Sequence, residues 1–175
     1  MRQSQKEKIY VFIDSQNLNL AIKSLGWSLD FQRFFVYLKD KYKAKKVLLF
    51  IGYVADNEAL YASLQKIGYL LVFKPTLEYK KGGDAFVKGN VDAELVLHAM
   101  IEYNNYDKAV VVTGDGDFHC LIEYLHDQKK LRHVLIPNQK SYSALLRKFH
   151  PYFVYVSVLK KKLEKKNRLT KKERE

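Results

Sequence analysis

Short runs of apolar residues recur along the chain, and each is separated from the next by a stretch with helical spacing. The first run is apolar at every position, which is typical of a strand buried on both faces. Five such runs are present, at residues 9–13, 46–53, 70–73, 109–113 and 133–136. Strands that alternate with helices predict an α/β fold, with a parallel sheet between two layers of helices. We expect the strand order to be about 3-2-1-4-5.

The stretches between these runs predict helices, because their apolar residues recur three and four positions apart. Asp30 and Asn57 each precede such a stretch and are predicted N-caps. Further helices are predicted over residues 90–103, from Phe118 after the fourth strand, and over residues 141–148. A last apolar segment follows at residues 152–158.

Two segments depart from this alternation. Residues 75–89 contain three glycines and are long for a connection that only closes the chain, so we expect a mobile flap. Residues 160–175 carry nine Lys or Arg against three Glu, which predicts a helix that frays into a solvated tail. The predicted organisation is one domain over residues 8–158 and a basic C-terminal helix or tail over residues 159–175.

Composition and charge narrow the classes of function. A chain of 175 residues with 47% hydrophobic residues can bury one substantial core. Its net charge of +12 favours a polyanion as partner, with nucleic acid as the first choice and an anionic membrane surface as the second. No apolar run is long enough to span a bilayer, and we expect no export signal and no membrane segment.

The single cysteine, Cys120, cannot form an internal disulfide. Its setting between Phe118 and Leu121 predicts a small core residue rather than a nucleophile. A lone thiol fits a reducing compartment, so we expect a cytoplasmic protein.

Four acidic residues are predicted to meet at one edge of the sheet. Asp14 directly follows the first strand, Asp115 and Asp117 follow the fourth, and Asp92 lies in the first turn of the helix after the third. The carboxyl ends of parallel strands share one edge, where ligands bind at the point at which the strand order reverses. Like charges about 4 Å apart repel by roughly 4 kcal/mol, so this cluster predicts a bound Mg²⁺ or Mn²⁺. Each acid taken alone could instead be an N-cap or a turn former.

Two residues near these acids, Asn17 and Thr113, each have two possible roles. The Asn17 amide could orient a water or a phosphate oxygen, or it could cap the first helix. Thr113 could donate to a carboxylate or a phosphate, or simply end its strand. Gly114 and Gly116 leave the backbone bare, as an approaching ligand requires.

Three blocks of residues resemble the signature motifs of the NYN domain family, in its LabA-like bacterial branch. They are residues 13–18 (IDSQNL), 88–92 (KGNVD) and 113–118 (TGDGDF). The resemblance covers roughly residues 10–156. It departs from the family pattern at His98, where another acid is usual, and at the inserted Asn90.

The NYN family is a branch of the PIN-like nucleases, so the resemblance implies a Rossmann-like three-layer sandwich of the PIN-like type. It also implies a divalent-metal-dependent endoribonuclease that cleaves RNA, with single-stranded RNA expected and RNA favoured over DNA. The implied catalytic residues are Asp14, Asp92, Asp115 and Asp117, which would bind Mg²⁺ or Mn²⁺. Asn17 is a further candidate catalytic residue because it lies one turn beyond Asp14. His98 and His119 are interpreted as packed or surface residues rather than as part of this site.

Contacts to nucleic acid are predicted for basic and hydroxyl side chains near the site, namely Lys80, Lys81, Lys88, Thr113 and Lys140. Tyr79 and Phe86 could stack on bases or pack against their own domain. A rival hypothesis is a non-catalytic RNA-binding or regulatory module that keeps the nuclease fold. A phosphatase of the haloacid dehalogenase type is disfavoured, because Gln16 stands where that class needs a second acid. A homo-oligomer is compatible with the sequence.

Overall fold

A computed structural model describes residues 7–74, 77–81, 84–88 and 92–166, with side chains described outside residues 75–91. Its main sheet has six parallel strands in the order β3-β2-β1-β6-β7-β8. The strands are β1 (Ile9–Asp14), β2 (Lys46–Gly52), β3 (Leu70–Lys74), β6 (Lys108–Val112), β7 (Leu131–Ile136) and β8 (Phe153–Tyr155). This confirms the predicted parallel α/β sheet and its strand order, and the last apolar segment adds the short β8 at one edge.

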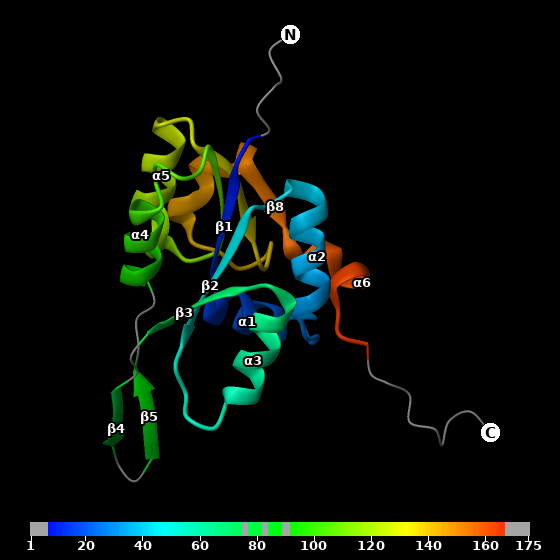
Figure 1. The fold of residues 1–175 in the computed structure, drawn as a ribbon, viewed down its shortest axis with the longest axis vertical. Helices are drawn as coiled ribbons and strands as arrows, with labels where there is room; N and C mark the ends of the chain where they lie inside the picture. Colours follow the sequence, from blue (N-terminus) through cyan, green and yellow to red (C-terminus); the bar gives the residue numbers. More distant parts are fainter. Residues whose placement is uncertain (1–6, 75–76, 82–83, 89–91, 167–175) are drawn as a thin grey trace, which may run out of the picture.

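Helices cover both faces of the sheet, so the fold is a three-layer sandwich (Figure 1). One face packs against α1 (Ser15–Lys23), α2 (Phe31–Tyr42), α3 (Glu58–Ile67) and α6 (Lys160–Leu163). The other face packs against α4 (Asp92–Ile101), α5 (His119–Asp127) and the 3₁₀ helices η1 (Gly116–Phe118) and η2 (Ala144–Tyr152). A third 3₁₀ helix, η3 (Val156–Leu159), links β8 to α6.

The continuous apolar run of β1 follows from its central position. Val11 and Ile13 face the layer of α1 and α2, whereas Tyr10 and Phe12 face the layer of α4 and α5. All four are buried. A strand with helices on both faces has no solvated side, which is why its sequence does not alternate between apolar and polar residues.

Of the two predicted N-caps, one makes capping hydrogen bonds with its side chain and the other does not. The Asp30 carboxylate accepts hydrogen bonds from Gln32 N at 3.0 Å and Arg33 N at 3.1 Å, which confirms it as the N-cap of α2. Asn57 occupies the N-cap position of α3, but its side chain makes no capping hydrogen bond.

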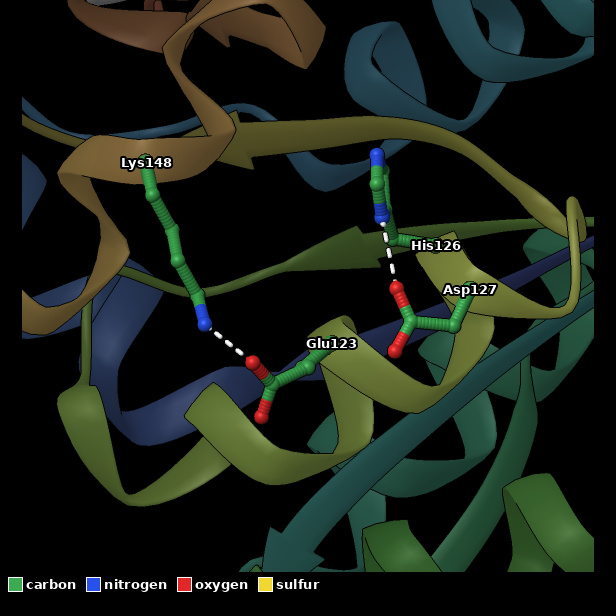
Figure 2. A network of polar contacts seen from close by, with 4 residues as sticks. All are labelled: Glu123, His126, Asp127 and Lys148. Carbon is green, nitrogen blue, oxygen red and sulfur yellow. Dashed lines mark hydrogen bonds and ion pairs between the residues drawn. The ribbon is translucent and has the colours of Figure 1, made fainter.

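The helix predicted over residues 141–148 is the 3₁₀ helix η2, which begins three residues later. Its first turn is closed by Leu146 N donating to Ser143 O at 3.1 Å, which is the i to i+3 bond of a 3₁₀ helix. Figure 2 shows how η2 is tied to α5, because Lys148 forms an ion pair with Glu123.

The connection predicted as a flap contains a two-stranded antiparallel sheet, formed by β4 (Leu77–Lys81) and β5 (Asp84–Lys88). Figure 1 shows this hairpin outside the six-stranded sheet. The sequence signal is Gly82-Gly83 between two strand-like runs, and such a dipeptide is typical of a tight hairpin turn. The side chains of Lys80, Lys81, Lys88, Tyr79 and Phe86 lie outside the described part of the structure, so their predicted contacts stay predictions.

Cys120 is exposed, so its predicted burial in the core is wrong. The buried stripe of α5 is formed by Leu121, Ile122 and Leu125. Cys120 precedes Leu121 by one position, which turns its side chain away from that stripe.

The described C-terminal residues pack against the domain as far as residue 165. Leu163 is fully buried, and its carbonyl accepts from Asp30 N at 2.8 Å. Lys165 N donates to Ser28 O at 2.9 Å. Residues 167–175 of the predicted tail lie outside the described residues. Within the described part of the chain, no helix combines the length and apolar character needed to cross a membrane.

Candidate metal centre

Asp14 lies at the carboxyl end of β1 and is only 4% exposed. It is the N-cap of α1, since its Oδ1 accepts from Asn17 N at 3.1 Å. Its Oδ2 accepts from the Thr113 hydroxyl at 3.2 Å. A buried carboxylate with two donors is therefore held rigidly between β1, α1 and the end of β6.

Burial raises the pKa of Asp14 from 3.8 to about 6, because the charged form loses water. The hydrogen bonds from Asn17 N and Thr113 act in the opposite direction and lower the pKa. The negative charges of Asp92 and Asp115 raise it further. Asp14 is thus coupled electrostatically to two of the other predicted acids.

Asp92, Asp115 and Asp117 form an acidic cluster that could hold a metal ion. One carboxylate oxygen from each lies within 4.8 Å of the others. Asp92 opens α4, whereas Asp115 and Asp117 follow β6 and reach the same edge of the sheet. Two unit charges at this separation repel by roughly 3 kcal/mol at an effective dielectric of 20. Carboxylate oxygens around one point are the donor set that a hard divalent cation such as Mg²⁺ or Mn²⁺ prefers, so the residues fit a metal ion.

The turn after β6 is organised by Thr113, which is fully buried. Its hydroxyl oxygen accepts from Asp115 N at 3.1 Å while the hydroxyl donates to Asp14. Asp115 in turn caps η1, accepting from Asp117 N at 3.0 Å. The Thr113 hydroxyl therefore donates to a carboxylate, which is one of the two predicted acceptors. A buried hydroxyl engaged in this way positions Asp14 and Asp115.

Asn17 joins the two halves of the site. Its side-chain oxygen accepts from Gly114 N at 2.8 Å, which ties α1 to the turn after β6. The cap of α1 is Asp14, so the alternative of Asn17 as N-cap is wrong. A contact between the Asn17 amide and a water or phosphate stays a prediction.

An open hollow of about 570 Å³ lies directly beside Asp115 and Asp117. Its lining also includes Lys140, Tyr142 and Ser143 from the segment between β7 and η2. Lys140 is held by a hydrogen bond from its backbone N to the Asn138 side chain at 2.9 Å. Lys140, the predicted phosphate contact, thus lines the same hollow as Asp115 and Asp117.

The two histidines near these elements pack against aromatic rings. The His98 ring lies 5.7 Å from the Phe50 ring, and the His119 ring lies 5.9 Å from the Phe149 ring. Among the described residues, neither belongs to a group of three or more side chains that could hold a metal. This agrees with their interpretation as packed residues.

Sequence reasoning missed Ser143, whose hydroxyl accepts from Leu145 N and caps η2. The missed signal is a serine directly before the apolar residues that start a helix. Ser143 also explains Gly116. A Cβ added at Gly116 would lie 2.9 Å from Ser143 Cβ and would contact Ser143 Oγ. The missing side chain of Gly116 makes room for Ser143.

We therefore expect Gly116→Ala to lower the free energy of unfolding by about 1–3 kcal/mol, because the added methyl group displaces a capping serine. Gly114→Ala is the matched control, since the nearest atom to its added Cβ is Tyr142 Cβ at 3.4 Å, an ordinary contact. Urea unfolding of both variants measures the difference. Equal stability of the two would contradict the close approach of Gly116 to Ser143.

The chain matches a protein family and is similar to a known relative. Residues 8–159 match the family described as NYN domain. The chain is 26% identical over 136 residues to the low amplitude and bright protein LabA of Synechococcus elongatus, covering 74% of this chain and 72% of that protein.

Two solved structures share the fold. A protein of unknown function from Vibrio parahaemolyticus has a TM-score of 0.71 at 22% identity, covering 89% of this chain and 96% of that one. T5 5′-exonuclease, solved with bound zinc, has a TM-score of 0.50 at 13% identity, covering 82% of this chain and 61% of that one. The chain thus spans less than two thirds of the T5 enzyme, and at these identities both likenesses show the fold alone.

Proposed function

The chain belongs to the NYN domain family and has a PIN-like nuclease fold, and we propose that it is a metal-dependent ribonuclease. The observation that carries this proposal is the cluster of Asp92, Asp115 and Asp117 at the edge of the sheet where ligands bind. The substrate we propose is single-stranded RNA, cut within the chain. RNA is chosen over DNA on family grounds.

In this proposal Asp92, Asp115 and Asp117 hold Mg²⁺ or Mn²⁺, with Asp14 beside them as a fourth carboxylate. When bound, such an ion activates a water for attack on phosphorus and neutralises charge that builds on the phosphate oxygens. Asp14 is held by Asn17 N and Thr113, so its carboxylate keeps a fixed position relative to the cluster. The Asn17 side chain accepts from Gly114 N, which fixes the turn that carries Asp115 relative to α1.

The substrate backbone is proposed to enter the hollow beside the acids, where Lys140 would contact a phosphate. Lys80, Lys81 and Lys88 of the hairpin are proposed to add further phosphate contacts. We place this activity in the cytoplasm, where a lone exposed cysteine such as Cys120 stays reduced.

Purified protein incubated with single-stranded RNA tests the proposal. We expect cut products with Mg²⁺ or Mn²⁺ and none with a chelator, because the carboxylates act through the ion. The rival hypothesis of a non-catalytic RNA-binding module predicts a salt-sensitive complex and no products with any metal. Products that persist in chelator would contradict metal dependence and point to a contaminating nuclease.

A further inference from the structure

The edge of the sheet opposite the acids is strongly basic. Lys8 directly precedes β1, Lys46 is the first residue of β2, and Lys108 is the first residue of β6. The strand register pairs Tyr10 with Lys46 and Ile9 with Lys108, so these strand starts lie side by side. We define the amino-edge basic face as Lys8, Lys43, Lys45, Lys46, Lys108, Lys129, Lys130 and Arg132.

Four acids lie near this face, Glu7, Glu102, Asp107 and Asp127, against the eight cations that define it. Glu102 forms an ion pair with Lys46 at 3.0 Å, and Asp107 accepts from Lys8 N at 2.7 Å. Asp127 is bound to His126 at 3.0 Å, as Figure 2 shows. Among the described residues, no ion pair involves Lys43, Lys45, Lys108, Lys129 or Arg132. The face therefore keeps a surplus of positive charge.

A hollow of about 570 Å³ lies at the part of this face formed by the starts of β6 and β7. Lys108, Lys129 and Arg132 line it, together with the His126–Asp127 pair and Tyr152. Lys108 Nζ donates to Lys129 O at 2.6 Å, which holds two of these residues against each other. Three cations therefore surround one concave surface that contains a single carboxylate, and its charge is suited to a phosphate group.

The form of the basic face favours an extended polyanion. Its cations follow the starts of four neighbouring strands rather than one point, which matches a row of phosphates. Among the described residues, no exposed large apolar side chain lies at residues 8, 43–46, 108 or 129–132, which carry these cations. A surface that docks on a membrane usually inserts apolar side chains, so nucleic acid is favoured over lipid.

We propose that the amino-edge basic face binds the phosphodiester backbone of a single-stranded nucleic acid, with its main contacts in the hollow of Lys108, Lys129 and Arg132. This binding site lies at the opposite end of the strands from the acidic cluster. It holds a strand of nucleic acid without metal and without cleavage. The proposal therefore stands or falls independently of the proposed nuclease activity.

The test measures binding of a fluorescently labelled oligouridylate in chelator, by anisotropy over a series of salt concentrations. The variant combines Lys129→Asn with Arg132→Gln. Asparagine tolerates the left-handed backbone of Lys129, whose φ is +58°, and Arg132 is exposed on β7. We expect affinity to fall roughly tenfold and the slope of log K against log salt to fall by about 1.4, since each lost contact to a single strand removes about 0.7.

The matched control is Lys23→Gln with Lys66→Gln, which removes the same charge from exposed positions on α1 and α3. We expect it to bind like the wild type. Arg132→Gln alone is expected to give about half the change in slope, and melting temperatures verify that each variant folds. Equal losses in the two double variants, or no loss in either, would overturn the proposal. It would also be overturned if only binding to phosphatidylserine vesicles, and not to RNA, depended on Lys129 and Arg132.

Discussion

Asp115→Asn is expected to lower metal-dependent RNA cleavage by at least roughly 100-fold, while the protein stays folded. The amide removes a negative charge from the cluster that Asp115 forms with Asp92 and Asp117, and metal binding weakens with it. The fold is expected to persist because an asparagine oxygen can still accept from Asp117 N, the bond that caps η1. Gel analysis of single-stranded RNA incubated with Mn²⁺ gives the cleavage rate.

Asp40→Asn is the matched control, because Asp40 is an exposed carboxylate on α2. The same change in charge and shape there should leave cleavage and the Mn²⁺ response unchanged. A second readout is the rise in melting temperature caused by Mn²⁺, which we expect to shrink in Asp115→Asn. Cleavage at the wild-type rate by Asp115→Asn would refute the role of this cluster.

The sheet could be predicted from the sequence because its strands are buried on both faces. The run at residues 9–13 has no polar position, and every residue in it is buried by one helical layer or the other. The short edge strand β8 gives a weaker signal, since its three residues are only half-buried. The hairpin of β4 and β5 was predicted only as a flap, although a Gly-Gly dipeptide between two strand-like runs is typical of a hairpin.

The approximate place of the acids could also be predicted, since strand ends and helix starts converge at one edge of a parallel sheet. The roles within the site depend on tertiary contacts that spacing does not reveal. The oxygens of Asp14 accept from Asn17 N and Thr113, whereas the cluster within 4.8 Å contains Asp92, Asp115 and Asp117. Likewise, Gly116 faces Ser143, a contact between residues of different elements, and no local pattern predicts it.

Asp14→Asn is expected to stabilise the metal-free protein at neutral pH. The folded-state pKa of Asp14, about 6, lies above the ordinary 3.8, so the wild type loses stability as pH rises from 3.8 to 6. The pKa of Asp14 is about 2 above its ordinary value, and each unit corresponds to 1.36 kcal/mol, so the ionised carboxylate lowers the unfolding free energy by about 3 kcal/mol. The amide carries no charge and avoids this cost, while its oxygen can still cap α1. We expect a gain of about 1–3 kcal/mol at pH 7.5 in chelator.

Urea unfolding at pH 4 and pH 7.5 separates this effect from a general change in packing. At pH 4 the Asp14 carboxyl of the folded wild type is largely protonated, so the two proteins should have nearly equal stability. At pH 7.5 in chelator, Asp14→Asn should be more stable than the wild type. Mn²⁺ should reduce this difference in unfolding free energy, since a cation near Asp14 offsets the burial of its charge and the repulsion from Asp92 and Asp115. A variant less stable than wild type at pH 7.5 in chelator would mean that the ionised carboxylate stabilises the fold. Asp14 would then act as a stabilising helix cap, and not as a destabilising carboxylate that serves metal binding.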